Sequence, residues 1–232
     1  MNPSLTFEQL NQVATTYGTP LYVYHGEKIE SQYQNLLTHF SPTTTRFFYA
    51  CKALTNIHIL NLIKNTGCNI DCSSINEVKL AKHAGFAPEN ILYTSNSISF
   101  EEIKEAVSLG VHINIYSLSN LEKFGAAFGG RYPVGIRIRP DIMAGGNLKI
   151  STGHNKSKFG IPYTEKDAIK NVELAKKMNV ECKLNYAFSS GPPIKFKNII
   201  IRVRNYSNFF SRSTRRCFWF SWCWWWLFFI IF

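Results

Sequence analysis

Six short apolar runs divide residues 47–184 at a nearly regular interval, and segments with helical periodicity separate them. The runs are Phe47–Ala50, Cys68–Asp71, Ile91–Thr94, Val111–Ile115, Pro133–Ile138 and Val180–Leu184. Strands that alternate with helices are typical of βαβ units around a parallel sheet. The pattern therefore predicts an α/β fold of about six such units. It does not by itself distinguish an incomplete (β/α)8 TIM-type barrel from a doubly wound open sheet.

The helical segments begin at recognisable capping signals. Ser99–Glu102 predicts a capping box, and the helix that follows it is expected to end at Gly110. Ser74–Glu77 and Ser119–Glu122 repeat the same spacing, and Thr164–Asp167 is a weaker version of it. We expect a helix after each of these four signals.

Two further elements are expected before the first run. The pattern over Thr6–Tyr17 predicts a helix, and Pro20–Tyr24 predicts a strand. The first residues contain no basic region followed by a long apolar run, so we expect no signal peptide and a cytoplasmic protein.

The net charge of +11 is concentrated at one end of the chain. Residues 1–182 contain all 15 acidic residues and 18 of the 26 basic ones. Residues 183–232 contain the other 8 basic residues and all five Trp. The chain is therefore a nearly neutral segment of ordinary composition joined to a basic, aromatic tail.

Six cysteines are present, and their spacing gives no metal motif. Cys68 and Cys72 are four residues apart, which fits neither a CxxC redox pair nor a paired zinc knuckle. We expect reduced, buried thiols and no metal.

Polar residues follow the carboxyl ends of several expected strands, where parallel α/β folds place their chemistry. Lys52 follows the first run and could serve as an imine-forming amine, or merely extend its ammonium group into solvent. Asp71 ends the second run and should face the same rim. Glu77 has a competing structural role in its capping box. Arg137 and Arg139 alternate with apolar residues and should face the same way.

Four motifs in this order resemble the pyridoxal-phosphate-dependent decarboxylases that have an alanine-racemase-type barrel. They are Tyr49–Ala53, Asp71–Glu77, Gly135–Pro140 followed by Gly145–Gly153, and Ser157–Gly160. Within that family the diaminopimelate decarboxylases are the most similar. The resemblance covers residues 20–182 and favours the barrel over the open sheet.

This resemblance implies a site and a cofactor. Lys52 would be covalently attached to pyridoxal 5'-phosphate, and the cofactor would supply the electron sink for the loss of carbon dioxide. Asp71 and Glu77 would lie near the lysine and adjust its protonation, and Arg137 would support the cofactor. The family also implies a homodimer, because its active sites form at a dimer interface. The strand near residues 21–24 would join a C-terminal β-domain that is missing here.

After Cys182 the resemblance stops, and three interpretations of the tail compete. As a membrane anchor, the apolar stretch is shorter than the ~20 residues that a spanning helix needs. As a nucleic-acid-binding segment, it separates its aromatic residues from its arginines. The third interpretation is that the tail is translated out of frame, and the codons favour it. Trp has a single codon, so Trp224–Trp226 must be TGGTGGTGG, which reads as glycine codons after a one-base shift. Asn185–Phe188, shifted likewise, can encode Met-His. We therefore expect a frameshift near residues 183–185.

Three parts are thus expected: an N-terminal helix and strand (1–25), a partial pyridoxal-phosphate-binding barrel (26–182) and an out-of-frame tail (183–232). The expected function is decarboxylation of meso-diaminopimelate to L-lysine, this chain being a truncated, inactive form. We expect a small amino-acid substrate, no nucleic acid and no membrane partner. Two alternatives stay open: a decarboxylase of another basic amino acid or carboxynorspermidine, and a non-catalytic paralogue that binds a decarboxylase subunit.

Overall fold

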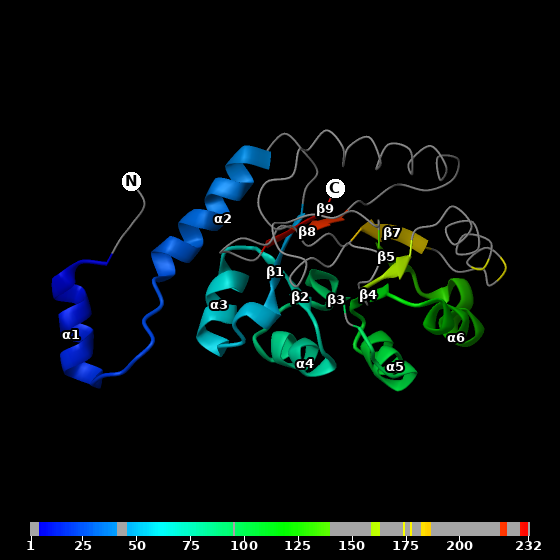
Figure 1. Cartoon of the computed structure of the whole chain (residues 1–232), viewed down its shortest axis with the longest axis horizontal. Helices are drawn as coiled ribbons and strands as arrows, with labels where there is room; N and C mark the ends of the chain where they lie inside the picture. Colours follow the sequence, from blue (N-terminus) through cyan, green and yellow to red (C-terminus); the bar gives the residue numbers. More distant parts are fainter. Residues whose placement is uncertain are drawn as a thin grey trace.

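The computed structural model describes residues 5–40, 46–94, 96–137 and 159–162, together with Leu174, Lys177 and the backbone of 138–139, 182–186, 219–221 and 228–231. The side chain of Arg139 therefore lies outside the described residues. It has the α/β fold that the sequence pattern predicts (Figure 1). The capping signal expected at 164–167 and the motif at 145–153 lie outside the described residues.

The described chain alternates strands and helices. The strands are β1 (Arg46–Ala50), β2 (Asn69–Cys72), β3 (Ile91–Thr94), β4 (His112–Ile115), β5 (Val134–Arg139), β6 (Ile161–Pro162), β7 (Cys182–Tyr186), β8 (Trp219–Ser221) and β9 (Phe228–Ile231). The helices are α1 (Phe7–Tyr17), α2 (Gly26–Phe40), α3 (Ile57–Asn65), α4 (Ile75–His83), α5 (Phe100–Ser108) and α6 (Leu118–Phe128). Short 3-10 turns are η1 (Cys51–Ala53), η2 (Pro88–Asn90) and η3 (Gly129–Arg131).

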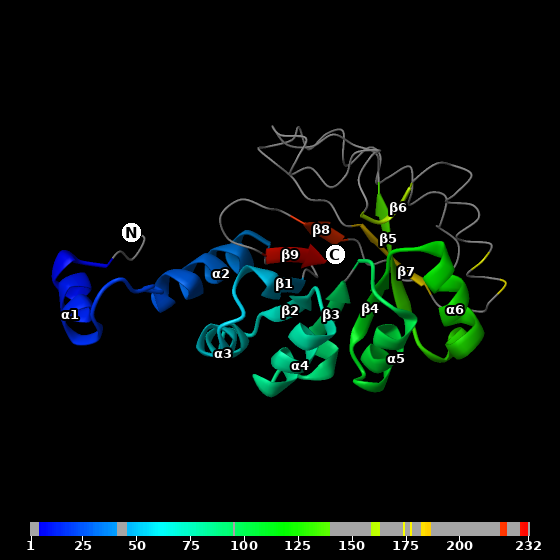
Figure 2. The ribbon, with the colours of Figure 1, turned by 60° about the horizontal axis from the view of Figure 1, so that its bottom comes forward.

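All the strands belong to one sheet, in which β1 to β6 are neighbours in chain order and run parallel. The strand β7 also pairs with β5 in parallel, whereas β9 runs antiparallel to both β1 and β8. Helices α3 to α6 lie along one side of the parallel strands (Figures 1 and 2). Among the described residues, the pairings follow an open path and do not close into a ring.

Side-chain alternation gives the sheet two different faces. On the helix-covered face, buried apolar residues of consecutive strands form the core with the helices; examples are Phe47, Ile70, Ile91, Ile113 and Ile136. Burial of such side chains stabilises the fold by about 1.5–3 kcal/mol each. The residues between them point to the opposite face and include the polar groups described below.

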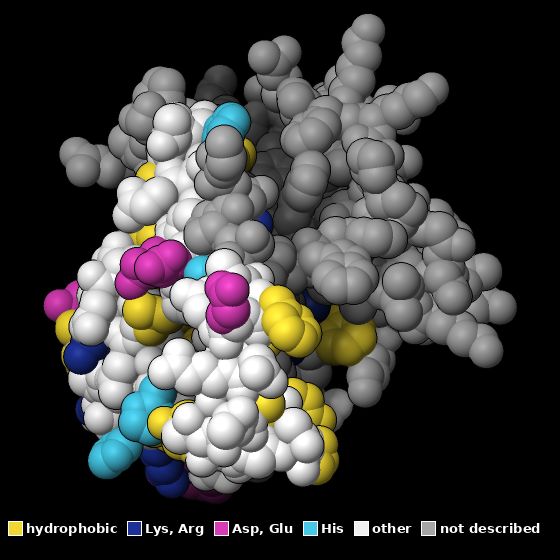
Figure 3. Space-filling view, turned by 90° about the vertical axis from the view of Figure 1, so that its left-hand side faces the viewer, with side chains coloured by type: hydrophobic (Ala, Val, Ile, Leu, Met, Phe, Trp, Pro, Cys, Tyr) yellow, Lys and Arg dark blue, Asp and Glu magenta, His cyan; other side chains and the backbone are white. Residues whose placement is uncertain are grey.

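The N-terminal part differs from its prediction. Helix α1 forms with a complete capping box at Thr6, but it buries none of its residues. Residues 21–25 form no strand, so the strand expected at Pro20–Tyr24 is wrong for the described structure. Tyr22 is 91% exposed, and an extended segment without a neighbouring strand has nothing to satisfy its backbone groups except water. Figure 3 shows hydrophobic side chains on this side of the molecule among acidic ones.

The capping predictions are partly confirmed. The box at Ser99 and Glu102 forms at the start of α5. Ser74 caps α4 through the backbone N–H of Glu77. The cap expected at Ser119 is wrong, because α6 begins two residues earlier, where the Ser117 hydroxyl accepts from the N–H of Asn120. No helix within the described residues is long and apolar enough to cross a membrane.

Candidate functional site

Polar side chains lie in the carboxyl-terminal halves of four neighbouring strands, on the face opposite the helices. Asp71 of β2 pairs in register with Leu92, and Thr94 lies two residues further along β3. Asn114 of β4 is in register with both Thr94 and Gly135, and Arg137 lies two residues beyond Gly135 on β5. Because alternate residues of a strand share a face, these four side chains line one side of the sheet.

Asp71 is the electrostatic centre of this row. It is 3% exposed, and burial raises the pKa of its carboxyl group to about 7. A hydrogen bond with the Thr94 side chain and the positive charges of Lys52 and Arg137 oppose this rise, whereas the charge of Glu77 adds to it. Thr94 in turn accepts from the Asn114 amide at 2.8 Å. Three residues predicted from the sequence, Lys52, Glu77 and Arg137, therefore act electrostatically on the fourth, Asp71.

The Oδ1 atom of Asp71 has no hydrogen-bond partner within the part of the chain that the structure describes. A buried carboxylate oxygen without a partner is costly, by about 1–3 kcal/mol or more. Such an atom at the end of a parallel strand is a candidate contact for a bound ligand.

Lys52 lies in η1, directly after β1, and its side chain is exposed. The strand end fixes the backbone beside it, since Cys51 is fully buried in the core and Tyr49 donates its hydroxyl to the Leu54 carbonyl at 3.2 Å. An exposed primary amine on a rigid turn is accessible to a carbonyl compound.

Arg137 supplies a half-buried positive charge. Burial lowers the pKa of its guanidinium to about 10, and the nearby Asp71 charge opposes this shift. The guanidinium carbon also lies 4.9 Å from the centre of the Phe159 ring, a cation–π distance. Phe159 comes from the Ser157–Gly160 motif, so two of the motifs found in the sequence meet here.

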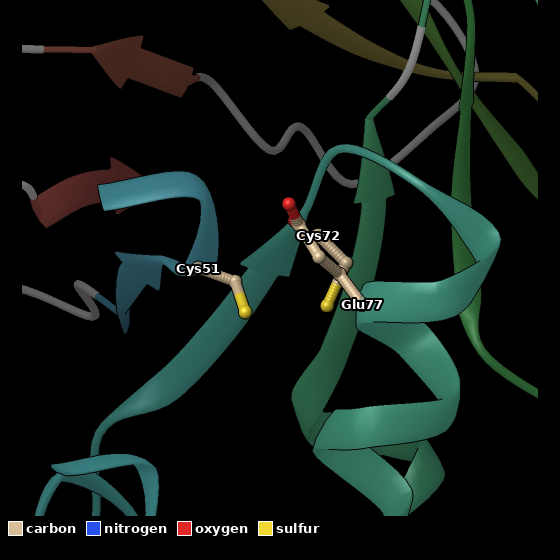
Figure 4. Close-up of side chains that lie close together, drawn as sticks. All are labelled: Cys51, Cys72 and Glu77. Carbon is tan, nitrogen blue, oxygen red and sulfur yellow. The ribbon is translucent and has the colours of Figure 1, made fainter. Parts of the chain in front are cut away.

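Glu77 lies in the first turn of α4, on the other side of the strand ends. Its carboxylate accepts from the Ser73 N–H at 2.7 Å instead of from the N-cap residue Ser74, so the capping box predicted there is only half formed. The same carboxylate lies beside the buried thiols of Cys51 and Cys72 (Figure 4). The sequence predicted a packing role for Cys51 and gave no reason to pair it with Cys72.

Sequence reasoning missed Thr94 and Asn114. A signal was present, because Thr94 is the last residue of the third apolar run and Asn114 is the last but one residue of the fourth. Tyr116 follows the fourth strand, and its hydroxyl accepts from the Ile98 N–H at 3.2 Å, which fixes the loop before α5.

Comparison with known proteins identifies relatives of this chain. The family described as "Pyridoxal-dependent decarboxylase, pyridoxal binding domain" matches residues 26–185. A diaminopimelate decarboxylase of Methanothermobacter thermautotrophicus is 37% identical over 156 residues, which is 66% of this chain and 36% of that protein. One from Helicobacter pylori is 35% identical over 175 residues, which is 74% of this chain and 42% of that protein.

Solved structures agree with these matches. The crystal structure of diaminopimelate decarboxylase from Helicobacter pylori complexed with L-lysine superposes with a TM-score of 0.75 at 29% identity, covering 90% of this chain and 55% of that one. The enzyme from M. jannaschii in complex with L-lysine gives a TM-score of 0.70 at 28% identity, covering 85% of this chain and 48% of that one. This chain spans about two fifths of the length of the two curated relatives named above.

Proposed function

Because this chain belongs to the pyridoxal-dependent decarboxylases, we propose that it carries the cofactor-binding part of an enzyme that converts meso-diaminopimelate to L-lysine. The relatives named diaminopimelate decarboxylase, at 30–37% identity, support meso-diaminopimelate as the substrate. The observation that carries the proposal is the cluster of Lys52, Arg137 and Glu77 around the buried Asp71.

The residues present fit pyridoxal phosphate. Lys52 offers an exposed amine for attachment of the aldehyde. The Oδ1 atom of Asp71, which has no hydrogen-bond partner among the described residues, offers a buried acceptor close to a positive charge. When bound, the cofactor supplies an electron sink, which accepts the electron pair of the carbon–carbon bond that breaks when carbon dioxide leaves.

The chain's own residues then divide the remaining work. The carboxyl group of Asp71, with a pKa of about 7, can hold or release a proton beside Lys52 at neutral pH. The positive charges of Lys52 and Arg137 lower the pKa of the Asp71 carboxyl group and so favour its ionised form. The negative charge of Glu77 raises the pKa of the Asp71 carboxyl group. The Glu77 carboxylate is held in place by a hydrogen bond from the Ser73 N–H. Thr94 and Asn114 hold the Asp71 side chain in one orientation.

The proposal includes residues 1–25 as a separate N-terminal part, 26–182 as the cofactor-binding part, and 183–232 as a tail translated out of frame. The charge distribution and the codons of Trp224–Trp226 support the last point. By family resemblance, a histidine strand and a phosphate-binding glycine loop belong where this tail stands. We therefore propose that the chain as printed does not turn over substrate, and that the intact enzyme is a cytoplasmic homodimer.

Resequencing the gene across the codons for residues 175–232 and downstream is the first test. If the shifted frame encodes a Met-His pair and a glycine run, the frame-corrected chain is then produced beside the chain as printed. Both are incubated with pyridoxal phosphate, reduced with borohydride and mapped by mass spectrometry. We expect about one label per frame-corrected chain, on Lys52, and lysine formation from meso-diaminopimelate.

Matched variants separate the possible outcomes. Lys52→Arg should abolish both the label and turnover, whereas Lys79→Arg, at an exposed residue paired with Glu105, should change neither. Stable labelling and turnover by the chain as printed would contradict the proposed inactivity. Turnover only of ornithine, arginine or carboxynorspermidine would overturn the substrate. Co-purification of the printed chain with a full-length decarboxylase would favour a non-catalytic binding subunit.

A further inference from the structure

Two buried thiols and one carboxylate meet where β1 and β2 end. The two strands are parallel neighbours with Ala50 opposite Asp71, so the next residues, Cys51 and Cys72, stand side by side on the helix-covered face. Glu77 reaches the same place from the first turn of α4 (Figure 4). The two sulfurs and a carboxylate oxygen all lie within 4.8 Å of one another.

Because 4.8 Å is an upper limit on these separations, the three atoms are near enough to share one metal ion after a small contraction. Zinc binds thiolate sulfur at about 2.3 Å and carboxylate oxygen at about 2.0–2.2 Å, which places tetrahedral ligand atoms roughly 3.5–4 Å apart. Two thiolates with one carboxylate are a donor set for soft or borderline divalent ions. Both thiols are 0% exposed, whereas Glu77 is half-buried, so the carboxylate side is the route by which an ion would enter.

The carboxylate is already oriented for such a role. One of its oxygens accepts from the Ser73 N–H at 2.7 Å, and the Ser74 hydroxyl anchors the Glu77 backbone N–H at 3.2 Å. Ligating carboxylates are typically held by hydrogen bonds of this kind.

We propose that Cys51, Cys72 and Glu77 form a binding site for a soft divalent metal ion such as Zn²⁺. Binding releases one proton from each thiol to solvent and needs no oxidant. The site lies next to Lys52 in the chain, so an ion would fix the turn η1 that carries this lysine. The inference rests on the chain's own side chains and stands even if the proposed decarboxylation fails.

The test uses metals alone on the reduced, metal-free chain. Cys182, Cys217 and Cys223 are first replaced by Ser, which leaves the three cysteines that the structure describes as free. Titration with Cd²⁺ is followed by the thiolate-to-metal absorbance in the ultraviolet, and with Co²⁺ by its visible bands. We expect one ion to bind per chain, with a charge-transfer absorbance of the size that two thiolate ligands give. Added Zn²⁺ should displace the bound Cd²⁺ or Co²⁺.

Three variants decide the assignment. Cys51→Ser and Cys72→Ser should each lower the affinity at least tenfold, and Glu77→Gln should lower it tenfold without altering the buried core. The matched control is Cys68→Ser, since Cys68 is equally buried but contacts the Phe47 and Asn69 carbonyls. Far-UV circular dichroism checks that each variant folds. Unchanged binding in the Glu77 and Cys72 variants would overturn the site.

Trypsin provides a second check. It yields residues 47–52, which contain Cys51, and residues 65–79, which contain both Cys72 and the control Cys68. Zn²⁺ should slow alkylation of Cys51 and Cys72 and leave that of Cys68 unchanged. A disulfide that links these two peptides in the untreated chain would overturn the metal site in favour of a redox pair.

Discussion

Asp71 shows how strongly the fold changes the chemistry of a single residue. Its carboxyl group has an ordinary pKa of 3.8 in the unfolded chain and about 7 in the folded one, chiefly because of burial. The folded state therefore holds the proton more tightly than the unfolded state. The stability attached to this group is fully present below about pH 4 and is lost as the pH rises toward 7.

Asp71→Asn should remove this dependence on pH. We expect the free energy of unfolding of the variant, relative to the parent chain, to increase by up to about 4 kcal/mol between pH 4 and pH 7. The amide keeps an oxygen that can accept from Thr94, so the local geometry is retained. Urea unfolding at a series of pH values measures the difference. If the difference in free energy of unfolding between the two chains stays constant with pH, then folding does not change the proton affinity of Asp71.

At the scale of an element, the start of α6 shows that the sequence can predict a serine N-cap correctly and still assign it to the wrong serine. Both Ser117 and Ser119 precede polar residues at capping spacing. The structure selects Ser117, whose extended backbone lets its hydroxyl reach the Asn120 N–H at 3.3 Å. Burial of Leu121 and Phe124 fixes the face of the helix and therefore the turn at which it begins.

Replacement of each serine by alanine tests this assignment. Ser117→Ala should cost about 1 kcal/mol of stability, because an N-cap hydroxyl is lost. Ser119→Ala should be neutral or slightly stabilising, because Ser119 is exposed within the first turn and alanine favours helix. Thermal and urea unfolding of the two variants provide the comparison. The reverse order of stabilities would support the start inferred from sequence.

At the scale of the whole molecule, the packed body begins at α2 and not at α1. Phe47 on β1 is 1% exposed, and its ring makes edge-on contacts with Tyr33 at 6.1 Å and Phe40 at 5.6 Å, both from α2. Phe7 on α1 is 82% exposed. The family match also starts at residue 26, where α2 begins.

A pair of phenylalanine substitutions tests this division. Phe47→Ala should cost about 3–5 kcal/mol, since it removes a large buried ring from the core. Phe7→Ala should change stability by less than about 0.5 kcal/mol, since an exposed residue loses little. Urea unfolding followed by far-UV circular dichroism measures both. A loss of similar size in the two variants would show that α1 is packed against another part of the protein.

The sequence by itself determined the α/β class, the positions of the strands β1 to β5 along the chain and the family, because apolar periodicity, helix caps and motifs are local properties of the chain. It also placed Lys52, Asp71 and Arg137 at strand ends, since a parallel sheet collects those ends at one edge. The codon pattern of the tail is likewise a property of the sequence alone.

Only the tertiary structure decided which side chains meet. Register across neighbouring strands links Asp71 to Thr94 and Asn114, and it brings together Cys51 and Cys72, which are 21 residues apart in the chain. The pKa of Asp71 likewise depends on burial and on charges from several strands. The absence of a strand at 21–24 has the same origin, since a strand needs a neighbour and no local pattern supplies one.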